Sequence, residues 1–113
     1  MPHFLVQFSY TPSSVATLVH EPDVDHAAQA AAMVASVGAT MLGYWYCFGE
    51  FDGAVVFEAP DPAAAAAIAM AIRATGEVTR MQTTALLTMD EARKAAHRAA
   101  AATHLPPTGS SDQ

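Results

Sequence analysis

Two side chains of this sequence have the chemistry of a general acid or base and are expected to lie near each other. Asp52 stands just before an apolar run typical of a central strand, 53–59, where burial would raise the pKa of its carboxyl group. His26 lies in an alanine-rich segment expected to form a helix over the sheet, within reach of Asp52 or of a tyrosine. We therefore predict that His26 and Asp52 carry any proton transfer.

Both residues also have structural interpretations, which the sequence alone leaves open. An aspartate at a turn commonly accepts hydrogen bonds from backbone N–H groups, and Asp52 would then only hold the turn. His26 ends a charged segment, 20–26, that would form a solvated junction between helices. This segment holds two histidines and three carboxylates, but their spacing matches no compact ligand set such as an i,i+4 pair on one helix. No metal site is predicted.

Aromatic side chains on the expected strands favour a pocket for a flat aromatic or quinone-like ligand. Tyr10 and Trp45 are the predicted ring contacts, with Tyr44 and Tyr46 nearby, and Arg80 is the predicted anchor for an anionic group. The alternative is that aromatic residues at strand spacing form the core or a dimer interface, and that an arginine on an edge strand only prevents aggregation. Tyr10, Trp45 and Arg80 are the predicted ligand-binding residues.

A β-hairpin must position these groups, with arms expected over 40–48 and 53–59. Glycines frame its connection, and we predict that Gly49 holds a φ above zero. Strict alternation along the first arm divides its bulky residues between two faces. One face would carry Leu42, Tyr44, Tyr46 and Phe48, and the other Met41, Trp45 and Cys47. Because either face then exposes large apolar groups, we predict a homodimer that stacks sheet on sheet.

Four helices are expected around this hairpin. The first covers 15–20, and the second runs from a cap at Asp23 or Asp25 to 37, where Gly38 ends it. The third runs from a cap at Asp61 to 74. The fourth starts at the capping box of Thr88 and continues to about 103.

The order of these segments predicts the fold. Alternating apolar residues predict a strand over 3–10, and a threonine-rich run predicts another strand, at an edge or with a bulge, over 78–87. Together with the hairpin and the helices they give an α+β, ferredoxin-like βαββαβ domain with an extra C-terminal helix, spanning 1–104. Residues 105–113, rich in Pro, Gly, Ser and Asp, are predicted to be a disordered tail.

Composition and charge disfavour several classes of function. Five Lys and Arg against eleven Asp and Glu give a net charge of −6, so nucleic acid is not expected as a partner. No apolar run approaches the ~20 residues that span a bilayer, so no membrane contact is expected. The N-terminus lacks the pattern of a signal peptide and Cys47 is the only cysteine, so a cytoplasmic protein without a disulfide is predicted.

The hairpin also resembles a known family. Gly49-Glu50-Phe51-Asp52, after an aromatic strand and before Val55-Val56-Phe57-Glu58-Ala59-Pro60-Asp61, resembles the GYD-domain family, small bacterial proteins of the dimeric α/β-barrel superfamily. The resemblance extends over most of 3–92 and includes Thr11, Gly38, Gly76 and Val78. Phe51 departs from the usual tyrosine of the family, and His26 stands where a basic residue often falls. The resemblance implies that the sheets of two chains stack into a dimeric barrel.

The resemblance does not imply one activity. The superfamily includes cofactor-independent monooxygenases, muconolactone-type isomerases and haem-handling enzymes, while the same glycine and aspartate are similar to ligand-binding domains of leucine-responsive-type regulators. No phosphate loop or paired glycine fingerprint is present, so no cofactor is predicted. We expect a small planar or aromatic metabolite in a pocket between sheet and helices, with monooxygenase- or isomerase-like proton transfer as one hypothesis. The alternative is a non-catalytic module, either ligand-binding and regulatory or a structural dimer.

Overall fold

The computed structural model describes residues 1–103, so the predicted tail over 105–113 lies outside the described residues. In chain order the elements are strand β1 (His3–Tyr10), helices α1 (Pro12–His20) and α2 (His26–Ser36), strands β2 (Thr40–Tyr46) and β3 (Gly53–Glu58), helix α3 (Pro62–Ala74), strand β4 (Val78–Leu86) and helix α4 (Met89–Ala100). This is the predicted α+β, ferredoxin-like arrangement with an extra C-terminal helix. None of the described helices is long and apolar enough to cross a bilayer.

The four strands form one antiparallel sheet in the order β2-β3-β1-β4. The predicted hairpin is confirmed as β2 and β3, and β1 fills the centre between β3 and β4. The last strand lies at an edge, and its pairing with β1 shifts register between Ser9 and Tyr10. Both features that the weak alternation of this strand predicted, an edge position and an irregularity, are therefore present.

Short-range signals start and end most helices close to the predicted positions, but α1 begins at Pro12, directly after its N-cap Thr11, and not at 15. Asp25, rather than Asp23, caps α2 by accepting a hydrogen bond from the N–H of Ala28 at 2.9 Å. Asp61 caps α3, and Thr88 with Glu91 forms the complete capping box of α4. Gly38 follows α2 with a φ of 83°, and Gly76 follows α3 with a φ of 74°, a conformation that glycine adopts without strain.

The prediction for Gly49 is wrong. Within residues 1–103, the glycines with positive φ are Gly38 and Gly76. Six residues, 47–52, connect β2 to β3, and a connection of this length reverses the chain without a left-handed residue at Gly49. The backbone N–H of Cys47 donates to the carbonyl of Asp52 at 2.7 Å and closes this loop.

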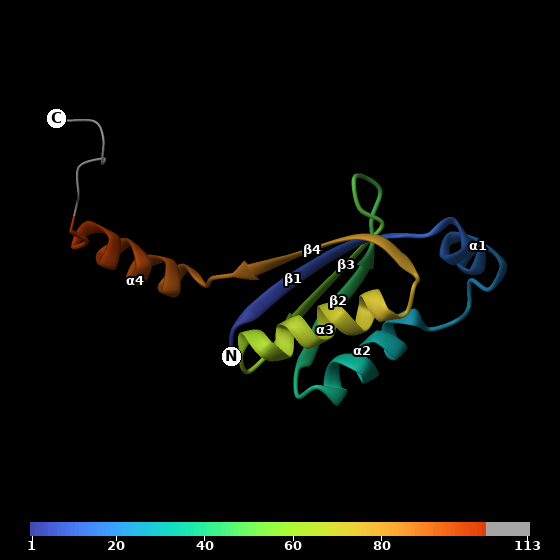
Figure 1. Ribbon diagram of the computed structural model, residues 1–113, viewed down its shortest axis with the longest axis horizontal. Coiled ribbons are helices and arrows are strands. Elements are labelled where there is room, and N and C mark those ends of the chain that lie inside the picture. The colour runs from blue at the N-terminus through green and yellow to red at the C-terminus, as the bar shows by residue number, and fades with distance from the viewer. Residues whose placement is uncertain (104–113) are drawn as a thin grey trace.

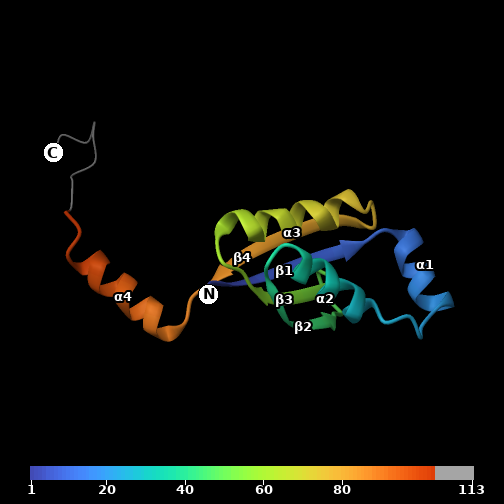
Figure 2. The same cartoon turned by 90° about the horizontal axis from the view of Figure 1, so that it is seen from below.

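Helices α2 and α3 lie over the same face of the sheet, the covered face (Figure 1). Figure 2, a view at right angles to the first, shows α1 beyond one end of the sheet and α4 beyond the other. The core lies between the covered face and α2 and α3. Its large buried side chains are Phe4, Val6, Phe8, Val34, Val55, Phe57 and Ile68.

A bulge in β2 changes the predicted division of its side chains. The pairing of β2 with β3 shifts register between Met41 and Gly43. Met41 and Tyr44 then stand opposite Phe57 and Val55 and both pack against the core, although strict alternation placed Met41 with Trp45. An extra residue in one strand of a pair turns the side chains beyond it to the other face.

Candidate ligand-binding site

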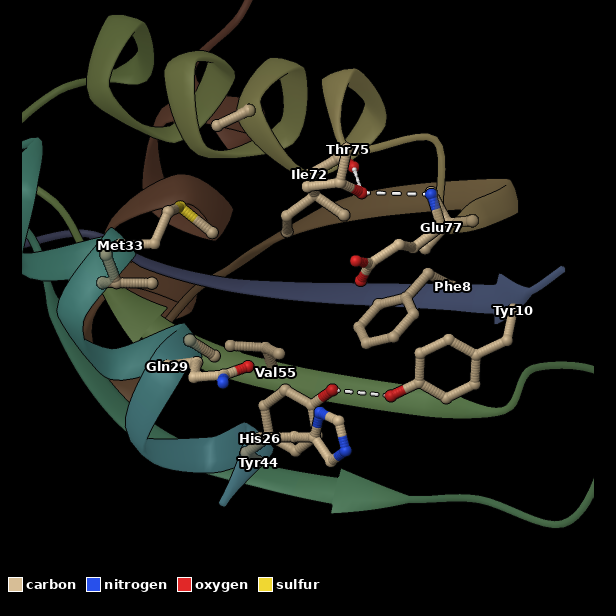
Figure 3. A pocket seen from close by; sticks show the side chains of 14 residues that line it. Phe8, Tyr10, His26, Gln29, Met33, Tyr44, Val55, Ile72, Thr75 and Glu77 are labelled. Atoms are coloured by element: carbon tan, nitrogen blue, oxygen red, sulfur yellow. Dashed lines mark hydrogen bonds between the residues drawn. The ribbon is translucent and has the colours of Figure 1, made fainter. Parts of the chain in front are cut away.

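A cavity of about 240 Å³ lies between the covered face and helices α2 and α3 (Figure 3). Its walls are mostly apolar. It is lined by Phe8, Tyr10, His26, Gln29, Ala30, Met33, Val34, Tyr44, Val55, Ala71, Ile72, Thr75, Glu77 and Val78. Ala30 of α2 and Ala71 of α3 are among the lining residues, and their short side chains leave space above the rings of the sheet.

Two tyrosines meet at the sheet side of this cavity. The hydroxyl groups of Tyr10 on β1 and Tyr44 on β2 are 2.6 Å apart and share a hydrogen bond across β3. The ring of Phe8 contacts both tyrosine rings edge to face, with centroids 5.3 and 6.1 Å away. Burial raises the pKa of Tyr10, and the hydrogen bond that it shares with Tyr44 adds to this effect. Burial also raises the pKa of Tyr44, so both phenols stay neutral and act through hydrogen bonds.

His26 reaches the cavity from the first position of α2, next to Tyr44 in Figure 3. Its Nε2 atom is buried and has no hydrogen-bond partner among the residues that the structure describes. Buried polar atoms are almost always paired, and one left unpaired costs about 1–3 kcal/mol. A ligand whose polar atom reached this nitrogen would remove this cost.

Glu77 directs its carboxylate toward the cavity from the connection between α3 and β4 (Figure 3). Its N–H donates to Thr75 Oγ1 at 3.1 Å, and that hydroxyl donates to the carbonyl of Ile72 at 2.6 Å, which fixes the backbone. The sequence predictions missed Glu77. The signal that could have found it is a carboxylate directly after Gly76, where the chain turns back toward the sheet.

A second hollow of about 170 Å³ adjoins the cavity beneath α1. It is lined by Tyr10, Ser13, Ser14, Thr17, Leu18, His26 and Glu77. Tyr10, His26 and Glu77 line both spaces, so these three side chains form the boundary between an apolar chamber and a hydroxyl-rich one.

The structure brings together only part of the predicted site. Tyr10 and His26 line the same cavity, as expected. Asp52 is not among the lining residues. Its carboxylate Oδ2 accepts a hydrogen bond from the backbone N–H of Tyr10 at 2.9 Å, and its own N–H donates to the carbonyl of Phe8 at 2.9 Å. Asp52 therefore ties the loop before β3 to the end of β1 and holds Tyr10 in place.

Trp45 and Arg80 lie on the other face of the sheet, the open face. Trp45 stands opposite Ala54 and Arg80 opposite Ser9, and both positions alternate with residues that face the helices. The guanidinium group of Arg80 lies 3.2 Å from the carboxylate of Glu50 and 4.7 Å from the ring centre of Phe51. Phe51 thus offers its aromatic face to a cation.

Comparison with known proteins adds the family to this geometry. Residues 4–96 match the family model described as the GYD domain. The chain belongs to the GYD-domain family. This match confirms the family that the hairpin residues resembled. No curated protein matches the chain.

Solved structures of low sequence identity are also similar to this GYD domain. The crystal structure of FFRP-DM1 has a TM-score of 0.49 and 14% identity over 77% of this chain and 100% of that one. The hypothetical protein PHS023 from Pyrococcus horikoshii has a TM-score of 0.49 and 12% identity over 78% and 92%. An uncharacterized NIPSNAP domain protein from Burkholderia xenovorans has a TM-score of 0.46 and 12% identity over 78% and 94%.

Proposed function

We propose that this GYD domain binds a small planar metabolite in the cavity between the sheet and helices α2 and α3. The observation that carries the proposal is a mostly apolar cavity lined by the hydrogen-bonded Tyr10–Tyr44 pair and by His26, whose buried Nε2 is unpaired among the described residues. Ligand sites in proteins combine apolar walls with a few convergent polar groups in this way. The pocket is thus suited to a ring with one polar edge.

The size and walls of the cavity set the shape of the ligand. At about 240 Å³ it is larger than the roughly 150 Å³ apolar cavity that accepts benzene in an engineered protein, so one or two fused rings fit. The rings of Phe8 and Tyr44 line the sheet side, and Met33 and Ile72 line the helix side. A flat ligand between these two layers touches both.

Binding of indole tests this proposal. We expect saturable one-to-one binding by NMR titration, and at least about tenfold weaker binding by Ala71→Leu, whose added carbons occupy the cavity. Ala66→Leu on the same helix, at an exposed position outside the cavity, is the matched control and should bind like the wild type. Equal binding of indole by the wild type and Ala71→Leu would contradict the site.

A second candidate function is cofactor-independent proton transfer at the same site. The unpaired Nε2 of His26 favours it, because a free imidazole nitrogen beside a ligand can take a proton from one carbon and return it to another. The Tyr10–Tyr44 pair would hydrogen-bond the oxygen that gains charge. Asp52, the other predicted catalytic residue, would act by positioning Tyr10.

Deuterium exchange into 2-indanone, a planar ketone with acidic C–H bonds, tests this chemistry. A general base contributes about 10²–10⁴-fold, so His26→Ala should lower enzyme-dependent exchange by that factor and still bind indole. His20→Ala, which removes an exposed imidazole at the end of α1, is the control. Exchange at the same rate in His26→Ala would eliminate His26 as the base.

We also propose that the open face mediates a homodimer. Trp45 is 54% exposed there, and Leu5, Val56 and Leu86 are half-buried beside polar residues of the same face. Two such faces pack about 10 Å apart in stacked sheets and remove these side chains from water. In this assembly Trp45 and Arg80 would contact the second copy and not a ligand in the cavity.

A further inference from the structure

We infer that the ligand of this GYD domain is an aralkyl amine: a planar ring in the cavity, joined by a short chain to an amino group in the hollow beneath α1. The inference rests on the proposed ligand binding at this site and adds the chemical class of the ligand. It follows from the charges of the two spaces, from the way they join, and from the hydrogen bonds that their polar groups already make.

The charge of the two linings disfavours an anionic ligand. Among the residues that line the cavity and the hollow, the carboxylate is Glu77, and no lysine or arginine is present. Glu77 forms no ion pair within residues 1–103. Its charge also adds to burial in raising the pKa of Tyr44, so the electrostatic effect of this carboxylate extends into the cavity. A ligand with a carboxylate or a phosphate would face one negative charge and no matching cation.

The boundary between the two spaces indicates where the amino group lies. Tyr10, His26 and Glu77 line both the 240 Å³ cavity and the 170 Å³ hollow. A ring in the apolar cavity with a chain of two or three atoms past these residues would carry its end group into the hollow. That end group would lie beside the carboxylate of Glu77.

The hydroxyl groups of the hollow offer acceptors. Ser14 Oγ donates its hydrogen to the carbonyl of Glu77 at 2.9 Å, and Thr17 Oγ1 donates to the carbonyl of Ser13 at 3.2 Å. Ser14 Oγ therefore accepts the hydrogen of Thr11 Oγ1 at 2.9 Å and keeps one lone pair, whereas Thr17 Oγ1 keeps both of its lone pairs for an incoming donor. An ammonium group has three donors and no acceptor, so it matches two hydroxyl oxygens and a carboxylate better than an alcohol or an acid does.

A matched set of three probes tests the inference: 2-phenylethylamine, 2-phenylethanol and 3-phenylpropanoic acid, titrated calorimetrically into the full-length protein. We expect the amine to bind at least about tenfold more tightly than the alcohol, and the acid to bind most weakly. Glu77→Gln should weaken binding of the amine about tenfold and change binding of the alcohol less than about twofold. Glu21→Gln removes the same charge at the end of α1, outside both spaces, and should bind all three probes like the wild type.

The outcomes separate this inference from the proposal on which it rests. Binding of the acid as tight as that of the amine would overturn the inference and leave the planar-ligand site intact. Unchanged affinity of Glu77→Gln for the amine would also overturn the inference and leave the planar-ligand site intact. If indole binds and none of the three probes does, the amine is excluded. If neither indole nor any probe binds the wild type, both the planar-ligand site and the inference fail.

Discussion

The two faces of the sheet are made by the same strands and meet different surroundings. Along β1, Val6 points to the helices and is fully buried, whereas its neighbours Leu5 and Gln7 point to the open face and are half-buried. The covered face is closed by α2 and α3 and holds both the core and the cavity. The open face mixes apolar with polar groups. The difference assigns the core and the proposed ligand site to one face, and leaves the other face for the proposed contact with a second copy.

The covered face also differs along its own length. Large side chains such as Phe57 and Ile68 fill one part completely, while alanines of α2 and α3 lie over the tyrosine end and leave the cavity. The helices are alanine-rich, so the sheet supplies most of the bulk, and space remains where the sheet side chains cannot reach. The cavity is thus a consequence of composition as well as of topology.

The largest effect that separates the two faces is expected from truncation of a buried ring. Phe57→Ala removes a fully buried side chain and should lower the free energy of unfolding by about 3–5 kcal/mol in urea titrations. Leu5→Ala on the open face should lower it by only about 1 kcal/mol at low protein concentration. Equal losses of unfolding free energy in the two variants would contradict this difference between the faces, because Leu5 would then be as buried as the core.

The next effect concerns the open face as an interface. Trp45→Lys places a charge in the proposed sheet-to-sheet contact and should weaken the dimer by about 2 kcal/mol or more, close to 30-fold in dissociation constant. Val19→Lys on α1, where valine is 68% exposed, is the control and should leave the dimer unchanged. Sedimentation measures both. A wild-type monomer at micromolar concentration would remove the dimer proposal itself.

Gly53 on the covered face and Gly43 on the open face allow the two faces to be compared by the addition of a single carbon atom. A Cβ at Gly53 would overlap the ring of Phe8, which is held in the core, so Gly53→Ala should lower the free energy of unfolding by about 1–3 kcal/mol. A Cβ at Gly43 would overlap the ring of Trp45, which is half-exposed and free to turn in the single chain, so at protein concentrations too low for a dimer Gly43→Ala should change stability by less than about 0.5 kcal/mol. Chemical denaturation decides between the outcomes. A large loss for Gly43→Ala only at higher protein concentrations would show that a partner holds Trp45 in place.

Local signals made most of the fold predictable. The side chain of Asp61 and the amide that it caps are three residues apart, as are the partners of the Thr88 capping box, so these helix starts depend on few neighbours. Hydrophobic alternation over His3–Tyr10 gave the first strand with its limits. Family resemblance implied the same arrangement; the match to residues 4–96 confirms the family, and the structure shows the arrangement.

The site was less predictable because it depends on contacts between distant residues. Tyr10 and Tyr44 are 34 residues apart and meet only once β3 lies between their strands. Alternation placed Trp45 and Tyr44 on opposite faces but did not indicate which face the helices cover. Gly43 inside β2 is a signal for the bulge after Met41, but strict alternation along the strand leaves it out of account. Glu77 sits in a connection, where no periodicity indicates direction.

The smallest expected effect tests the hydrogen-bonded phenols of the covered face. Tyr44→Phe removes the hydroxyl bonded to Tyr10 and should lower the free energy of unfolding by about 0.5–1.5 kcal/mol at neutral pH.

Above pH 10 the wild type and Tyr10→Phe should differ in how steeply stability falls with pH. Burial raises the pKa of Tyr10 in the folded state, so the unfolded chain releases this proton first, and stability that is fully present below pH 10 is lost as the pH rises toward the folded-state value. Urea titrations at pH 8 and pH 11 should therefore show a steeper loss for the wild type than for Tyr10→Phe. Tyr46→Phe, which removes an exposed phenol, should keep the steep loss of the wild type, and an equally steep loss in Tyr10→Phe would show that Tyr10 is not the group responsible.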